Sequence, residues 1–195
     1  MRTILSTLIC VLTAAWASQA QADSRQDQAM ATAKAMIQEL GSGLKSELQM
    51  AVKEKGFGGA VEACGKIAQT KAAQASQAHG GVIHRVSLKT RNPANEPDEL
   101  EAKYLKMMDE DMAKGQLKEA YFEVTGGQEG EKAVLRFLKP IVTSEFCLNC
   151  HGEKSKLNPD AAARLAQEYP ADKATGYQEN QVRGAFSATV LLGPK

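Results

Sequence analysis

The chain has 195 residues, and its 24 basic and 23 acidic side chains leave a formal net charge of +1. This balance provides no excess of basic residues of the kind that a nucleic-acid partner requires, so we expect no nucleic-acid binding. The length suits one domain with its own hydrophobic core.

Residues 1–22 have the features of a secretory signal peptide. Arg2 supplies the positive end, an apolar run over 4–15 follows, and Ala20-Gln21-Ala22 provides the small residues of a cleavage site. Cleavage after Ala22 would leave one domain over residues 23–195, which we expect in the periplasm. The apolar run is too short to span a bilayer and no other stretch is long enough, so no integral membrane segment is predicted.

Cleavage also changes the charge and the set of cysteines. The loss of Arg2 reduces the 24 basic residues by one, which then equals the 23 acidic ones. Cys10 leaves with the signal, and three cysteines remain. An odd cysteine in an oxidising compartment is expected to be buried, cross-linked between chains or bound to a metal. Cys64, which belongs to no motif of paired cysteines, is the residue that needs this explanation.

Residues 26–55 are predicted to form a long helix, because apolar residues recur there at spacings of three and four. Those residues are Ala33, Ile37, Leu40, Leu44, Leu48 and Val52. Gly41 and Gly43 weaken the middle, which leaves a kink or two helices open, and Gly56 is the expected stop. We favour packing of the apolar stripe on its own domain, and a homodimer or partner-helix face is the alternative.

A second helix is predicted from Gly58 to about Ala78, ended by Gly80-Gly81. Cys64 shares one of its faces with small apolar residues, namely Val61, Ala68, Ala72 and Ala75. A cysteine in such surroundings is either a small buried hydrophobe or a thiolate ligand to a metal, and the spacing leaves both open.

Residues 82–88 alternate like a strand, with Val82, His84, Val86 and Leu88 expected on the inner side. His84 is therefore a second candidate metal ligand. A turn over 91–98 leads into a predicted helix over 98–112, which carries Met107, Met108 and Met112. Methionines can bind iron, but at helical spacing they are more often core residues.

The remaining elements complete a small sheet. Strands are predicted over 120–124 and 133–139, with a glycine-rich connection over 125–130 and Pro140 closing the pair. A short helix over 160–167 and a last alternating strand over 184–192 follow. The order favours an α+β fold with a small antiparallel sheet flanked by helices and a long N-terminal helix.

The strongest motif is Cys147-Leu148-Asn149-Cys150-His151. This is the spacing at which two thiols add to the vinyl groups of haem while the histidine binds the iron. A zinc site would need a second ligand pair of similar spacing, and a thioredoxin-like dithiol would need a βαβ pattern around it; the sequence offers neither. One covalent haem c is therefore predicted, held through a short turn, with His151 on the iron.

Several separated motifs resemble the Tll-type haem domain family, whose members are c-type haem domains with a PAS-like fold. They are Ala60–Cys64, Arg85–Lys89, Arg91-Asn92-Pro93 with Asn95, Pro97, Asp98 and Glu101, Cys147–Gly152, and the closing Gly184–Ser187. The resemblance covers roughly residues 30–192. It implies that Cys64 is the distal haem ligand, opposite His151. Two departures are His84, where the family usually has a small residue, and Glu179-Asn180-Gln181, which replaces a glycine-containing loop.

The predicted function is that of an exported monohaem c-type cytochrome that exchanges electrons with a partner protein. Arg85 and Arg91 are candidate contacts for the haem propionates, because a guanidinium fork matches a carboxylate. The alternative is a periplasmic sensor of redox state or of CO, NO or O₂, which would work by exchange of the Cys64 ligand. A haem enzyme would need an acid–base pair at an open site, for which only His84 and Arg85 are available, so we expect no enzymatic activity.

Overall fold

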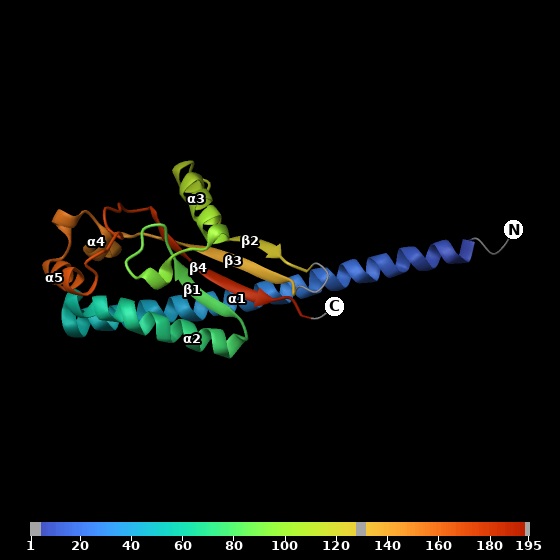
Figure 1. Cartoon of the computed structure of the whole chain (residues 1–195), viewed down its shortest axis with the longest axis horizontal. Helices are drawn as coiled ribbons and strands as arrows, with labels where there is room; N and C mark the ends of the chain where they lie inside the picture. Colours follow the sequence, from blue (N-terminus) through green and yellow to red (C-terminus); the bar gives the residue numbers. More distant parts are fainter. Residues whose placement is uncertain (1–4, 128–131, 194–195) are drawn as a thin grey trace.

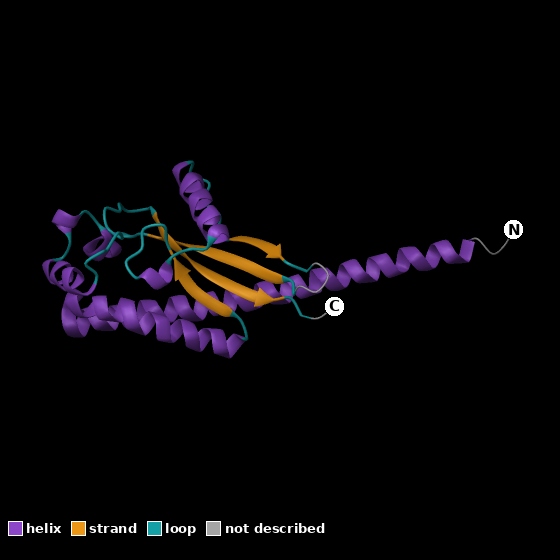
Figure 2. Ribbon diagram, in the orientation of Figure 1, coloured by secondary structure: helices purple, strands orange, loops and turns teal. Residues whose placement is uncertain are grey.

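The computed structural model describes residues 5–127 and 132–193, with side chains from residue 23 onward except those of residues 63 and 66. In this part of the chain, five α-helices surround one four-stranded antiparallel sheet (Figures 1 and 2). The helices are α1 (Leu5–Glu62), α2 (Ala68–His79), α3 (Glu99–Ala113), α4 (Glu145–His151) and α5 (Pro159–Glu168). The strands are β1 (Val82–Val86), β2 (Tyr121–Thr125), β3 (Val134–Val142) and β4 (Val182–Leu191). The predicted α+β class is confirmed.

The strand order in the sheet is β1-β4-β3-β2, so the C-terminal strand lies in the middle. Helices cover both faces: α1 and α2 pack on one face and α3 on the other. The helices α4 and α5 lie together at one end of the sheet, beside the reversal of the chain at Gly56 within α1 (Figure 1). This end is where the predicted functional residues gather.

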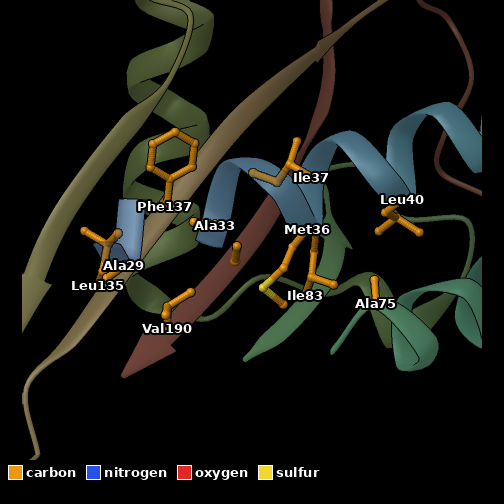
Figure 3. Close-up of a cluster of buried hydrophobic side chains, with 11 residues drawn as sticks. Ala29, Ala33, Met36, Ile37, Leu40, Ala75, Ile83, Leu135, Phe137 and Val190 are labelled. Carbon is orange, nitrogen blue, oxygen red and sulfur yellow. The ribbon is translucent and has the colours of Figure 1, made fainter. Parts of the chain in front are cut away.

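The apolar stripe of α1 packs on its own sheet. Figure 3 shows Ala33, Met36 and Ile37 of this helix beside Phe137 of β3 and Val190 of β4. Met36 and Ala33 are fully buried, and burial of each large aliphatic side chain contributes about 1.5–3 kcal/mol. The apolar stripe of α1 thus packs against the sheet of its own domain, as favoured from the sequence.

The opposite face of the sheet carries a second core under α3. Asp98 and Glu101 form a capping box that begins this helix, and Leu105 and Met108 are buried against the strands. Met107 and Met112 are partly buried against the same cluster. The three methionines of α3 are therefore core residues on this face.

Among the glycines of the first long helix, Gly56 acts as expected, whereas Gly41 and Gly43 do not. Gly56 has a φ of 66°, a left-handed conformation that ends the first helical run, as predicted. Gly41 and Gly43 stay helical, so the kink considered there is wrong. Gly41 instead lies against the ring of Phe186, where an added Cβ would be 3.6 Å from two ring carbons.

The second predicted helix, 58–78, comprises three pieces: the end of α1, a π-helical segment over Ala63–Ile67, and α2. The helix α2 runs back along α1 (Figure 1) and ends, as predicted, where Gly80 takes a left-handed φ of 69°. Cys64 therefore lies in the π-helical segment and not in a regular helix.

Two strand predictions need correction. The first strand is shorter than expected, and both Ile83 and Val86 are buried while Val82 and Leu88 are exposed. The alternation misleads there because helices cover both faces of β1. Pro140 does not end β3, which continues to Val142. The strand β2 pairs with β3 only as far as Leu138, so the missing N–H of Pro140 costs no bond to β2.

The predicted strand connection over 125–130 lies partly outside the described residues. The loop before β4 does lie within them, and Asn180 takes a positive φ of 61° there. Asparagine tolerates this conformation better than most residues, so it can replace a glycine in such a loop.

Candidate functional site

The cysteine motif forms the helix α4, where a turn was expected. Ser144, in an extended conformation, precedes it, and the Cys147 N–H donates to the Ser144 carbonyl at 2.9 Å. Cys150 follows Phe146 by four residues and Cys147 by three, so its side chain lies beside both on one side of the helix. Among the described residues, both motif cysteines are free thiols.

The imidazole of His151 has a fixed orientation. Its Nδ1 lies 2.8 Å from the carbonyl oxygen of Ala174. Because a carbonyl oxygen has no proton, this contact places the proton on Nδ1 and leaves the lone pair on Nε2. Histidines that bind metals are commonly held in this way.

The surroundings also keep His151 neutral. Burial, together with the positive charges of Arg183 and Arg91, lowers the pKa of this ring well below its usual value. A neutral imidazole is the form that binds a metal. Two backbone bonds steady the segment, from the Tyr177 N–H to the His151 carbonyl at 3.0 Å and from the Gly176 N–H to the Gly152 carbonyl at 2.8 Å.

One cavity of about 200 Å³ is lined by all of Cys147, Cys150, His151 and Cys64. Its wall is mainly apolar and includes Leu48, Phe57, Val61, Ile141 and Phe146. The rings of Phe57 and Phe146 lie 5.6 Å apart, centre to centre. No group of three or more His, Cys, Asp or Glu side chains in the described part of the chain is arranged to hold a bare metal ion. The lining therefore suits a largely apolar group, which the two thiols and the imidazole can hold.

Cys64 reaches this cavity from the π-helical segment. Such segments are rare and occur frequently at functional sites. Burial raises the pKa of the Cys64 thiol, and the positive charges of nearby arginines act in the opposite direction. The carbonyl of Cys64 accepts a hydrogen bond from Nη2 of Arg85 at 2.8 Å. The structure thus brings Cys64 and the α4 motif to the same cavity, from elements far apart in sequence.

The two arginines singled out in the sequence line the same cavity. Arg91 donates from Nη2 to the Cys150 carbonyl at 2.6 Å and forms an ion pair with Asp172 at 2.9 Å. Arg85 bonds to the Cys64 carbonyl, and burial lowers its pKa. Both arginines therefore support the backbone of a cysteine that faces the cavity.

A third arginine, Arg183, was missed. It lines the cavity, and its Nη1 donates to Ser87 Oγ at 2.7 Å and to the Lys89 carbonyl at 3.2 Å. Its Nε lies 3.2 Å from Nδ1 of His151. That nitrogen already donates to Ala174, so the Arg183 contact is one of charge and not a second hydrogen bond. Arg183 stands directly before the Gly184 motif, but the last strand was predicted to begin one residue later.

The alternative iron ligands lie elsewhere. Neither His84 nor any methionine is among the described residues that line the cavity. His84 follows Ile83 and precedes Arg85 on β1, so its side chain points to the α3 face of the sheet. Its Nε2 lies there 3.0 Å from Oε1 of Glu101. The structure therefore places Cys64 at the cavity, and not His84 or the methionines of α3.

Comparisons with known proteins bear on the fold and the family of the chain. No curated protein matches the sequence. A crystal structure of the cyanobacterial haem protein Tll0287 is similar, with a TM-score of 0.61 and 21% identity over 88% of this chain and 98% of that one. At this identity the likeness shows the shared fold. The sequence also matches the model of the Tll0287-like family over residues 15–190. The chain therefore belongs to the Tll0287-like family.

Proposed function

We propose that the protein is an exported monohaem c-type cytochrome that takes part in electron transfer. The observation that carries this proposal is the meeting of Cys147, Cys150, His151 and Cys64 at one apolar cavity. Membership of the Tll0287-like family, and the fold shared with a cyanobacterial haem protein, support haem as the bound group.

Each of these residues has a distinct task in the proposal. Cys147 and Cys150 would hold the haem covalently, His151 would offer Nε2 to the iron, and Cys64 would approach from the π-helical segment as the second ligand. The Ala174 carbonyl orients the His151 ring, and the Arg91 bond to the Cys150 carbonyl fixes the end of the motif. Haem bound there would supply one-electron redox chemistry.

The cavity is open to the surface, as electron transfer to a partner protein requires. Phe146 and Val142 line it and are 42% and 37% exposed, so the site reaches the surface where a redox partner can approach. No carboxylate and no second histidine is found among the described lining residues. An electron carrier needs no acid–base pair at the haem, so the proposed function requires neither group there.

Export to the periplasm is part of the proposal. Cleavage after Ala22 would shorten α1, whose first buried side chain among those described is Ala29. None of the helices in the described part of the chain has the length and apolarity that a bilayer crossing requires.

A periplasmic haem-based sensor is the second candidate. The π-helical segment around Cys64 favours it, because such a segment can rearrange to a regular helix and move that side chain. In this alternative Cys64 leaves the site on reduction, which opens it to CO, NO or O₂. A homodimer through the N-terminal helix would suit either role and stays a prediction.

The decisive experiment is an intact-mass measurement on protein from the periplasm of a host that attaches haem c. We expect the mass of residues 23–195 plus one haem, and the mass of the bare chain for the variant with Cys147→Ala and Cys150→Ala. A soluble wild-type protein without haem would contradict the proposed function. Binding of CO to the reduced protein would then favour the sensor, and its absence the carrier.

A further inference from the structure

The three arginines at the cavity differ in how their charge is balanced. Arg91 forms an ion pair with Asp172, and the two side chains are 10% and 11% exposed. Neither Arg85 nor Arg183 has a carboxylate within ion-pairing distance among the described residues. Their hydrogen bonds go to uncharged oxygens, namely the carbonyls of Cys64 and Lys89 and the hydroxyl of Ser87.

This difference matters because a partly buried guanidinium without an anion is costly. Withdrawing a cation from water is unfavourable unless an opposite charge or several hydrogen bonds replace the lost hydration. Arg91 meets that condition inside the protein. Arg85 and Arg183 meet it only in part.

Both unpaired arginines also keep donors in reserve. Arg85 donates hydrogen bonds from Nη2 only, and Arg183 donates from Nη1 while its Nε faces the His151 ring. In the described part of the chain, neither Arg85 nor Arg183 is among the residues with a side-chain nitrogen that is both buried and unbonded. The remaining nitrogens of Arg85 and Arg183 are therefore not sealed inside the protein. Since both residues line the cavity, these donors are accessible to a bound group.

We propose that Arg85 and Arg183 are the two residues that bind the propionates of the haem, and that Arg91 is a structural residue. This inference rests on the proposed function, because it assumes that haem occupies the cavity. Two unpaired cations match a group with two carboxylates. The assignment replaces Arg91 with Arg183 in the pair predicted from the sequence.

The test compares a diacid with its diester on the full mature chain produced without attached haem. The probes are iron mesoporphyrin, whose ethyl groups cannot add to thiols, and its dimethyl ester, which lacks the two negative charges. Affinities are measured by absorbance titration for the wild type, Arg85→Gln, Arg183→Gln, Arg183→Lys and Arg91→Gln. Arg164→Gln serves as a charge control, because Arg164 pairs with Glu168 on the surface of α5.

We expect the wild type to prefer the diacid. Arg85→Gln and Arg183→Gln should each weaken the diacid about tenfold or more, as expected for loss of one charge-assisted hydrogen bond, and leave the diester unchanged. Arg183→Lys should keep part of the preference, because it retains the charge. Arg91→Gln should affect both probes equally, and Arg164→Gln neither.

Two results would overturn the inference. One is equal affinity of the wild type for diacid and diester, which needs no variant and so does not depend on whether a variant folds. The other is an Arg183→Gln variant with native circular dichroism that weakens both probes equally. If neither porphyrin binds the folded wild type, the proposed function itself fails, which is a separate outcome.

Discussion

The two faces of the sheet hold charged side chains in opposite ways, and neighbouring residues of β1 show the contrast. His84 points toward α3, where its Nε2 lies 3.0 Å from the buried Glu101. Arg85 points toward the cavity, where its bond goes to the uncharged carbonyl of Cys64. One strand thus connects a balanced charge cluster with an unbalanced one.

The cluster under α3 is balanced within the protein. Glu101 accepts from Ser187 Oγ at 2.6 Å and lies 3.2 Å from Arg136, which also contacts Asp98 at 2.6 Å. At the cavity, by contrast, Asp172 is the acidic partner of Arg91 alone. Charges that the fold balances itself serve stability, whereas charges left unbalanced beside a cavity indicate a ligand of opposite charge.

The largest expected effect is the loss of the balanced cluster. Glu101→Leu would leave Ser187 and Arg136 without their buried acceptor, and breaking a buried pair from one side costs about 3–5 kcal/mol. We expect a loss of unfolding free energy of that size in urea denaturation, because Arg136 is only 16% exposed.

The matched control is Glu99→Gln, because Glu99 is exposed in the first turn of the same helix. It should change the unfolding free energy by less than about 0.5 kcal/mol. Equal stability of the Glu101→Leu variant and the wild type would show that the cluster is not structural.

A smaller effect is expected from pH. Burial alone would raise the pKa of Glu101, but hydrogen bonds from His84, Ser187 and the Asp98 backbone lower it from 4.5 to about 2. Because the folded value is depressed, the carboxylate stabilises the fold at all pH values above about 4.5. This contribution is lost as the pH falls from about 4.5 toward 2.

The measurement compares the wild type with Glu101→Gln in urea at neutral pH and near pH 3. The wild type should be more stable by roughly 1–3 kcal/mol at neutral pH, and the difference should shrink at low pH. Other carboxylates titrate in both proteins and cancel in the comparison. A difference that stays constant over this range would contradict the assigned role of Glu101.

Local sequence signals predicted most of the secondary structure correctly. Asp98 and Glu101 mark the start of α3 through the capping box, and Gly56 and Gly80 end helices by adopting positive φ. These signals act between residues close in the chain. They therefore need no knowledge of tertiary contacts.

The inward face of β1 could not be predicted in the same way. Strand alternation identifies one buried side, but Ile83 and Val86 are both buried because α1 and α3 cover opposite faces. His84 therefore lies on the α3 face, although the alternation made it a candidate metal ligand. The π-helical form of 63–67 also depends on backbone pairing that no residue type reports.

The sequence predicted the motif residues of the candidate site, but only some of the arginines that surround them. Cys147, Cys150 and His151 follow a spacing with a chemical reason, so the sequence alone identifies them. Arg183 carries no such spacing, since its role depends on β4, the residues after β1 and the end of α4 meeting at one point. A contact made by three separate segments is visible only in the folded chain.

The smallest expected effect is on the unfolding free energy of a variant of β1, His84→Ala. His84→Ala removes one bond to Glu101 from a side chain that is 38% exposed, so we expect a loss of only about 1 kcal/mol in unfolding free energy. The absorption spectrum of the oxidised haem protein should not change, because His84 lies on the α3 face. Cys64→Ala is the matched variant on the cavity side, and it should abolish any thiolate-to-iron charge-transfer band. A spectrum altered by His84→Ala and not by Cys64→Ala would reverse the assignment of the two faces, and with it the second iron ligand.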